Sequence, residues 1–209
     1  MIAIDKKRGG DLYKYLRRYR RRKQRFPKQP RVAKLIQERV FIEQRKSVVE
    51  NRSRLGDWER DLMIGKAHSS AIAAFVDRKT RFTKLCMPSD KKAKTLNRVT
   101  KEALKNLPCK TITNDNGTEW SHHKELSKQL KVPIYFTRPY ASWEKGTCEN
   151  TIGLVRQFLP KKTDFNNISH QQLKEIEWAI NNRPRKTLNW RTPYEVMFNK
   201  KLHLTLESR

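Results

Sequence analysis

Three consecutive segments with strand-like patterns constrain the fold of this chain more than any other feature. Residues 58–65 alternate apolar and polar side chains, residues 71–76 form a short apolar run, and residues 81–87 alternate again. Patterns of this kind predict short β-strands. Only residues 77–80 separate the second segment from the third, which predicts an antiparallel hairpin. The core must therefore form on a sheet that begins with three sequential strands.

Helix-like and strand-like patterns alternate after this start. Residues 91–107 carry apolar side chains at spacings of three and four and stop at Pro108, which predicts a helix. Ser169 and Thr192 each stand three residues before Gln or Glu, a spacing typical of helix starts. The other expected elements are strands at 110–113 and 134–137 and helices at 118–131, 145–159, 169–181 and from 192 onward.

This order predicts an α/β fold with a mixed five-stranded sheet and helices on both faces. The order resembles that of ribonuclease-H-like folds. In such a sheet, an acid in the middle of the first strand lies beside an acid at the end of the fourth. A helix after the fifth strand can bring a third acid over them. Asp61, Asp115 and Glu149 occupy these three positions.

The charge of the chain points to a polyanionic partner. The sequence holds 48 Lys and Arg against 21 Asp and Glu, a formal net charge of +27. Self-repulsion of this size is relieved by a polyanion, and nucleic acid is the default candidate. No apolar run is long enough for a membrane helix, and the first residues lack the apolar core of a signal peptide. We therefore expect a soluble, cytoplasmic protein that associates with the nucleoid through DNA and not with a membrane.

The charge is concentrated near the start, where residues 1–50 hold 17 Lys or Arg against 5 Asp or Glu. We expect residues 1–50 to be a basic arm and residues 51–209 to be one compact α/β domain, long enough to bury a hydrophobic core. Such an arm is typically disordered alone, and on DNA it would neutralise phosphates. The arginines expected to contact DNA are Arg17, Arg18, Arg20, Arg21 and Arg22.

Cysteines and histidines do not suggest a metal site. The three cysteines are odd in number and widely spaced, so we expect no disulfide. The five histidines lack ligand spacing and fit surface roles better.

Each acid by itself has an ordinary explanation. Asp61 could be a solvent-facing strand residue, and Asp115 opens a D-N-G turn signal. Glu149 stands near a helix start, where a negative charge is favourable. Only the three together favour a site for hard divalent cations, which prefer carboxylate ligands.

Longer motifs surround the acids and carry a family resemblance. Asp61 lies in W-E-R-D, and 33 residues separate Asp115 from Glu149. The stretches P-Y-A-S-W-E-K-G-T-C-E-N-T-I-G-L-V-R-Q-F-L-P-K at 139–161 and N-N-R-P-R-K-T-L-N-W-R-T-P-Y-E-V at 181–196 complete the pattern. Together they closely resemble the DDE transposases of bacterial insertion sequences, specifically the IS-thirty family, over nearly the whole chain.

The resemblance implies a catalytic DNA transposase with an integrase-type core. It assigns Asp61, Asp115 and Glu149 as the catalytic triad, binding two Mg²⁺ ions for which Mn²⁺ substitutes. The implied reaction is cleavage of the ends of the element and strand transfer into target DNA. The implied partners are double-stranded DNA, both element ends and target, and further copies of the chain in at least a dimer.

Several neighbours of the triad are expected to assist. The resemblance places Arg156, two helical turns after Glu149, against the DNA backbone, although an exposed helix arginine is an alternative. Asn116 is expected to orient a metal ligand, and Glu59 to point to the face opposite Asp61. Further expected DNA contacts are Arg138, Tyr140, Trp143 and Lys145, with packing of Trp143 beneath the helix as an equal alternative.

The sequence also departs from the family. The helix-turn-helix region that reads the terminal repeats is expected to be absent, because Met1 falls just before the basic connecting segment. Arg60 replaces a more usual glycine and is expected to crowd or brace the site, and Cys148 replaces a polar residue. Two alternatives stay open: a truncated, non-catalytic DNA-binding relative that occupies DNA or modulates a full-length transposase, and a simple nuclease.

Overall fold

The computed structural model describes residues 5, 8–12, 36–139 and 141–200. They fall into two units, Met1–Arg31 and Val32–Arg209. All the strands of the sheet and helices α2 to α7 lie in the second unit.

A single mixed sheet of six strands organises the second unit, in the order β1-β6-β5-β2-β3-β4. The pairs β2–β3 and β3–β4 are antiparallel, and the other pairs are parallel. The predicted mixed sheet is confirmed, but five strands was one too few. The strands are β1 (Val40–Phe41), β2 (Asp57–Ile64), β3 (Ala71–Asp77), β4 (Thr83–Cys86), β5 (Thr111–Asn114) and β6 (Ile134–Phe136).

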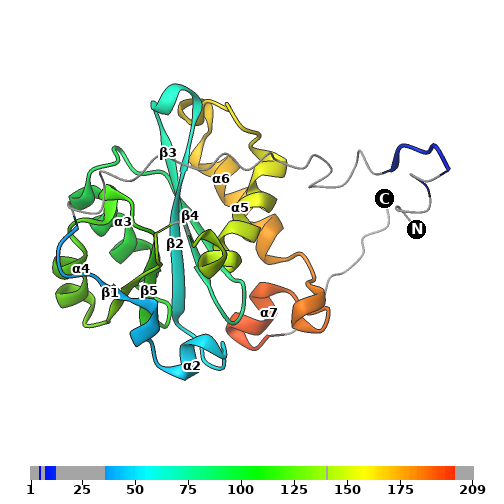
Figure 1. The fold of residues 1–209 in the computed structure, drawn as a ribbon. Coiled ribbons are helices and arrows are strands. Elements are labelled where there is room, and N and C mark those ends of the chain that lie inside the picture. Colours follow the sequence, from blue (N-terminus) through cyan, green and yellow to red (C-terminus); the bar gives the residue numbers. More distant parts are fainter. Residues whose placement is uncertain (1–4, 6–7, 13–35, 140, 201–209) are drawn as a thin grey trace. The chain divides into compact units, whose positions relative to one another are not determined.

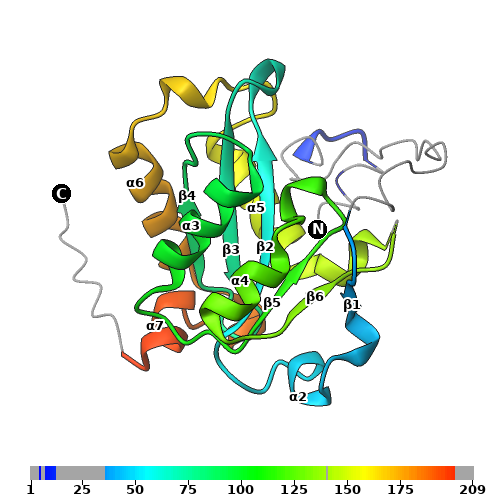
Figure 2. The same ribbon diagram turned by 90° about the vertical axis from the view of Figure 1, so that its left-hand side faces the viewer.

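Helices cover both faces of this sheet, as expected. Figure 1 shows the sheet almost edge-on, with α3 and α4 on one side and α5 and α6 on the other, and Figure 2 shows α3 and α4 in front of the strands. No helix among the described residues is long and apolar enough to cross a membrane. The helices are α2 (Ser47–Glu50), α3 (Ala93–Leu104), α4 (His123–Leu130), α5 (Gly146–Phe158), α6 (His170–Asn181) and α7 (Pro193–Phe198).

Alternation along the central strands divides the core into two layers. Trp58 and Phe75 are buried in the cluster on the α3 side, whereas Met63 and Ile72 are buried in the cluster on the α5 side. Successive side chains of a strand point to opposite faces, so one strand serves both layers. Residues of β2 at odd positions therefore face α5, which decides where Asp61 points.

The predicted helix starts of α6 and α7 are confirmed in detail. Ser169 and Gln172 exchange side-chain and backbone hydrogen bonds in a capping box, and Thr192 and Glu195 do the same. Pro193 occupies the first turn of α7, where its missing N–H costs nothing.

The segment before residue 50 contributes to the core. β1 pairs with β6, and Ile36 and Val49 are buried. A two-residue strand inside a basic segment has no readable alternation, which is why the sequence did not predict it. The boundary at residue 50 stays a prediction, and the predicted DNA-binding arginines 17–22 lie outside the described residues.

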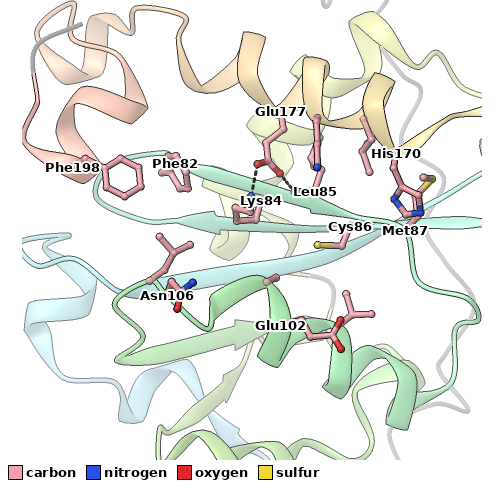
Figure 3. A pocket seen from close by; sticks show the side chains of 15 residues that line it. Phe82, Lys84, Leu85, Cys86, Met87, Glu102, Asn106, His170, Glu177 and Phe198 are labelled. Atoms are coloured by element: carbon pink, nitrogen blue, oxygen red, sulfur yellow. Dashed lines mark hydrogen bonds and ion pairs between the residues drawn. The ribbon is translucent and has the colours of Figure 1, made fainter.

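Side chains of α6 cover the outer edge of β4. The backbone N–H of Thr83 donates to Asn181 Oδ1 at 2.8 Å, and Asn181 Nδ2 donates to the Thr83 carbonyl at 2.8 Å. One turn away, Glu177 accepts from Lys84 and from the Leu85 N–H (Figure 3). Unpaired strand edges are templates for aggregation, and these side chains block the edge.

The residues in Figure 3 line a cavity of about 560 Å³ beside β4. None of the three predicted catalytic acids lines it. This cavity is therefore separate from the candidate site.

We predict that Asn181→Ala lowers the free energy of unfolding by about 2–6 kcal/mol, because two buried backbone groups of Thr83 lose their partner at about 1–3 kcal/mol each. Urea unfolding measures this, and light scattering should show faster aggregation. Asn182→Ala is the control: its amide donates to the Trp178 carbonyl at an exposed position, so its effect should be within about 0.5 kcal/mol. Equal effects of the two variants would contradict the edge-protection role.

Candidate active site

Asp61 and Asp115 lie on the same face of adjacent strands. β2 and β5 are parallel with Glu59 opposite Thr113, so two residues further along the chain Asp61 comes beside Asp115, the residue that follows β5. Asp61 is half-buried in the middle of β2, opposite Ala74 of β3. The structure thus brings together the first two acids that the sequence placed side by side.

The buried ammonium of Lys145 joins these two carboxylates. Lys145 Nζ lies 3.4 Å from Asp61 Oδ2 and 3.4 Å from Asp115 Oδ2, and it donates to the Arg60 carbonyl at 2.9 Å. The lysine belongs to the 3-10 turn Ser142–Lys145 that leads into α5. Sequence reasoning assigned Lys145 to DNA, but here the side chain is 7 % exposed and binds the acids.

The remaining carboxylate oxygens are held by neighbours. Asp115 Oδ1 accepts from Trp120 Nε1 at 2.8 Å and from the Gly117 N–H at 3.0 Å. Asp61 Oδ1 accepts from the Leu62 N–H at 2.8 Å. Each aspartate therefore has one oxygen fixed by donors and the other oxygen directed at a shared cation position.

Burial and charge act in opposite directions on this cluster. Burial raises the pKa of Asp61; the Lys145 charge opposes the rise and the Asp115 charge adds to it. Burial also favours neutral Asp115, but Lys145 and the donors from Gly117 and Trp120 outweigh it and lower the pKa of Asp115. Burial alone would lower the pKa of Lys145, yet the two aspartates raise it above its ordinary value. The cluster is stable as two carboxylates around one cation.

Glu149 stands in the first turn of α5, four residues after Lys145, and its side chain is exposed. Lys145 immediately precedes α5 as its N-cap, so Glu149 follows it by about one turn. Among the described residues, however, no group of three or more acids, histidines or cysteines is arranged to hold a metal ion. The structure unites Asp61 with Asp115 and leaves Glu149 outside their contacts.

Glu59 attaches α5 to the sheet, and here the sequence interpretation was wrong. Glu59 was expected to face away from Asp61, but residues two apart on a strand share a face. Its buried carboxylate accepts from the Cys148 N–H at 2.8 Å and from Arg78 Nη1 at 2.7 Å. Glu59 thus fixes the amino-terminal turn of the helix that carries Lys145 and Glu149.

Arg60 points to the other face of the sheet, away from the acids. Its guanidinium donates to Asn114 Oδ1 at 2.6 Å and Thr100 Oγ1 at 2.9 Å and stacks over Trp120, with its central carbon 4.1 Å from the ring centroid. It braces the site from behind, through the same tryptophan that binds Asp115, and does not crowd it.

The other residues predicted to contact DNA differ in their surroundings. Arg156 binds the carbonyl of Ile64 at 3.0 Å and packs on Phe165, Arg138 pairs with Glu144 at 2.7 Å, and Trp143 is 71 % exposed. A DNA role for these side chains stays a prediction. Packing of Trp143 beneath α5 does not fit its exposure, and Tyr140 lies outside the described residues.

The side-chain amide of Asn116, the residue after Asp115, bonds to groups other than the aspartate. Its Nδ2 donates to the Thr137 carbonyl at 2.6 Å, and its Oδ1 accepts from Arg39. These bonds fix the turn after β5, which is consistent with a supporting role.

Known proteins place this arrangement in context. The chain is 44% identical over 197 residues to the transposase of insertion sequence element IS4351 from Bacteroides fragilis, covering 93% of the chain and 60% of that protein. It is 41% identical over 166 residues to the IS1086 transposase of Cupriavidus metallidurans, and 38% identical over 159 residues to the IS30A transposase of Escherichia coli. These two matches cover 78% and 75% of the chain. The resemblance to insertion-sequence transposases is confirmed.

The chain spans 60%, 49% and 41% of the lengths of these three relatives. No protein-family model matches it. In fold it resembles the catalytic core domain of BIV integrase, with a TM-score of 0.54 at 15% identity over 68% of this chain and 93% of that one. It also resembles a chain of the simian T-cell lymphotropic virus intasome, with a TM-score of 0.60 at 18% identity over 74% of this chain and 58% of that one. The ribonuclease-H-like, integrase-type fold predicted from the sequence is confirmed.

We predict that Glu59→Ala destabilises the protein by about 3–5 kcal/mol, because it leaves buried Arg78 with only its longer pair to half-exposed Glu50 at 3.4 Å and removes the acceptor for the Cys148 N–H. Urea unfolding measures the change. Glu102→Ala is the control, because it breaks the Arg98–Glu102 pair at 3.6 Å, in which both side chains are more than 60 % exposed. Exposed pairs of this kind contribute about 0.3–0.5 kcal/mol. A Glu59→Ala loss as small as that of the control would contradict the anchoring role.

Proposed function

We propose that this chain is the catalytic part of a DNA transposase that cleaves the ends of an insertion sequence and transfers them to target DNA. The observation that supports this most directly is the convergence of Asp61 and Asp115 on one cation position, in a chain related to insertion-sequence transposases. Double-stranded DNA is the proposed substrate, at both the element end and the target. Pairing of two ends requires at least a dimer.

The residues present fit divalent metal ions at this position. Two carboxylate oxygens already face one buried positive charge, and hard cations such as Mg²⁺ and Mn²⁺ prefer oxygen ligands. Asp61, Asp115 and Glu149 would hold the ions, which supply charge neutralisation for the attacking and leaving oxygens of an in-line displacement at phosphorus. Glu149 would be the third ligand, from the first turn of α5.

The chain's own residues prepare this site. Trp120 and Gly117 hold one oxygen of Asp115 so that the other stays directed at the cation position. Lys145 favours the ionised forms of both aspartates, and it occupies the position that a metal ion would take between them. The DNA contact expected from the sequence would require its ammonium to leave the aspartates.

A second candidate is a non-catalytic DNA-binding relative that occupies DNA or modulates a full-length transposase. It is favoured by the ammonium at the cation position and by the lack, within the described residues, of a three-acid metal group. Such a protein would bind DNA equally well with and without its acids. It would give no cleaved or joined product with either metal.

The triad is tested by Asp61→Asn, Asp115→Asn and Glu149→Gln in a cleavage and strand-transfer assay, with duplexes carrying the sequences that flank the gene and with Mg²⁺ or Mn²⁺. We expect each variant to lose more than about 100-fold in rate, since even outer neighbours of metal ligands are worth 10–100-fold. Glu175→Gln, an exposed acid of α6, should keep full activity. Cleavage that survives Asp115→Asn would reject the site, and joined products separate a transposase from a nuclease.

The role of Lys145 is tested by Lys145→Met through melting temperature. In EDTA the variant should melt lower than wild type, because two adjacent carboxylates lose their shared cation. Mn²⁺ should raise its melting temperature more than that of wild type, since the ion no longer competes with the ammonium and a tighter ligand stabilises more. Lys84→Met, which removes the Lys84–Glu177 pair at β4, should show no difference from wild type in its Mn²⁺ response. An unchanged Mn²⁺ response of Lys145→Met would refute the competition.

A further inference from the structure

Three arginines from distant parts of the sequence line one small pocket of about 190 Å³. Arg52 lies between α2 and β2, Arg81 lies between β3 and β4, and Arg185 follows α6. Among the described residues, no acidic side chain lines this pocket. The other lining residues are Gly146, Thr147, Asn150, Thr151 and Thr187.

The guanidinium groups of Arg52 and Arg81 repel one another at this position. Burial, followed by the charge of Arg52, lowers the pKa of Arg81 to about 10. Glu59 and Asp77 oppose this shift, but Glu59 is bound by Arg78 and Asp77 accepts from backbone groups of its turn. The pocket therefore keeps a net positive charge that a bound anion would neutralise.

The donors suit a phosphate group. Guanidinium groups bind phosphate oxygens through paired hydrogen bonds, and threonine hydroxyls add single donors. Arg81 Nη1 is held by Thr147 Oγ1 at 2.6 Å, and Arg185 Nη2 by the Ile180 carbonyl at 3.0 Å. These bonds fix two of the guanidinium groups, and the Thr147 hydroxyl that holds Arg81 carries no charge. Arg52 is half-buried, and its guanidinium makes no hydrogen bond or ion pair with any described residue.

The rim is open enough for a polymer. Gly146, Asn150 and Thr187 are exposed, and a side chain at Gly146 would meet no atom within 4 Å. The pocket also adjoins the amino-terminal turn of α5, a helix of 13 residues whose positive end adds to the attraction for an anion.

The pocket and the candidate active site share this helix. Residues three and four apart lie together on a helix surface. Gly146 lines the pocket and lies three residues before Glu149, so the pocket borders the part of α5 that carries Glu149. A strand whose phosphate enters the pocket passes within the first turns of α5, next to Glu149.

We propose that Arg52, Arg81 and Arg185 together bind one backbone phosphate of the DNA strand that the acidic site processes. The inference rests on the proposed function for the identity of the polymer. The pocket positions the strand relative to Glu149, and the three arginines act as a unit on a single phosphodiester.

The test measures the affinity of the 209-residue chain for a 30-base-pair duplex at several salt concentrations in EDTA, by fluorescence anisotropy. Each phosphate neutralised on duplex DNA contributes about 0.9 to the slope of log K against log salt. The three arginines act as a unit on one phosphate, so the loss of any of them releases that phosphate. Arg52→Gln, Arg185→Gln and the double variant should therefore each reduce the magnitude of the slope by the same amount, about 0.9. Arg98→Gln, an exposed arginine of α3 on the other side of the sheet, should leave the slope unchanged.

Two results would overturn the proposal. An unchanged slope in both single variants would mean that the pocket does not bind DNA. A fall of about 1.8 in the double variant would mean that the arginines bind separate phosphates. Inorganic phosphate is the second ligand tested. It could raise the melting temperature of wild type but not of Arg52→Gln. If the DNA slopes are unchanged at the same time, the pocket is a site for small anions only.

The readout is independent of catalysis. Asp115→Asn tested in the same salt series isolates binding from chemistry, so failure of the proposed transposase activity leaves the slopes interpretable. Melting curves of Arg52→Gln confirm folding, and Arg52 is the best choice because its guanidinium makes no internal hydrogen bond that its loss would disrupt.

Discussion

The buried carboxylate of Glu59 is the contact on which the arrangement of the site depends. It sits inside the sheet at 0 % exposure, where an unpaired charge would be strongly destabilising. Arg78 supplies the countercharge, and the Cys148 N–H supplies a donor from α5. Because one carboxylate satisfies both, the hairpin and the helix are fixed to β2 at the same point. Lys145, just before this turn, reaches the aspartates only because the turn is fixed.

The two faces of strand β2 carry different groups. At odd positions β2 presents Glu59, Asp61 and Met63 to α5, while Arg60 at the even position lies buried beneath α3. Arg60 contributes its carbonyl to Lys145 and its guanidinium to the ring that holds Asp115. The face opposite the acids therefore helps to fix their geometry through Trp120 and the Arg60 carbonyl.

The sequence predicted what short-range patterns encode. Alternation and capping residues located the strands and helices, and parallel pairing then placed Asp61 beside Asp115. The contact of Lys145 with these acids joins residues 84 and 30 positions apart through the direction of a 3-10 turn, which no local pattern reveals. Strand periodicity could have predicted that Glu59 lies on the same face as Asp61, but the sequence interpretation placed it on the opposite face. The pocket of Arg52, Arg81 and Arg185 depends on tertiary packing of three loops, and loops carry no periodicity.

The proposed function requires a protein to hold cations with carboxylates and also to attract a phosphate, and helix α5 adjoins the groups suited to both tasks. Carboxylates that hold cations repel the phosphate on which those cations act, so the substrate must be attracted by positive groups that do not neutralise the acids. In this protein Lys145 and the two aspartates meet just before the first turn of α5, and the pocket of the three arginines adjoins that turn. In the proposed function the acids hold the metal ions and the arginines hold the strand, so the two groups of residues do not compete for one ligand. The first turns of α5 would then set where on the strand the acids act.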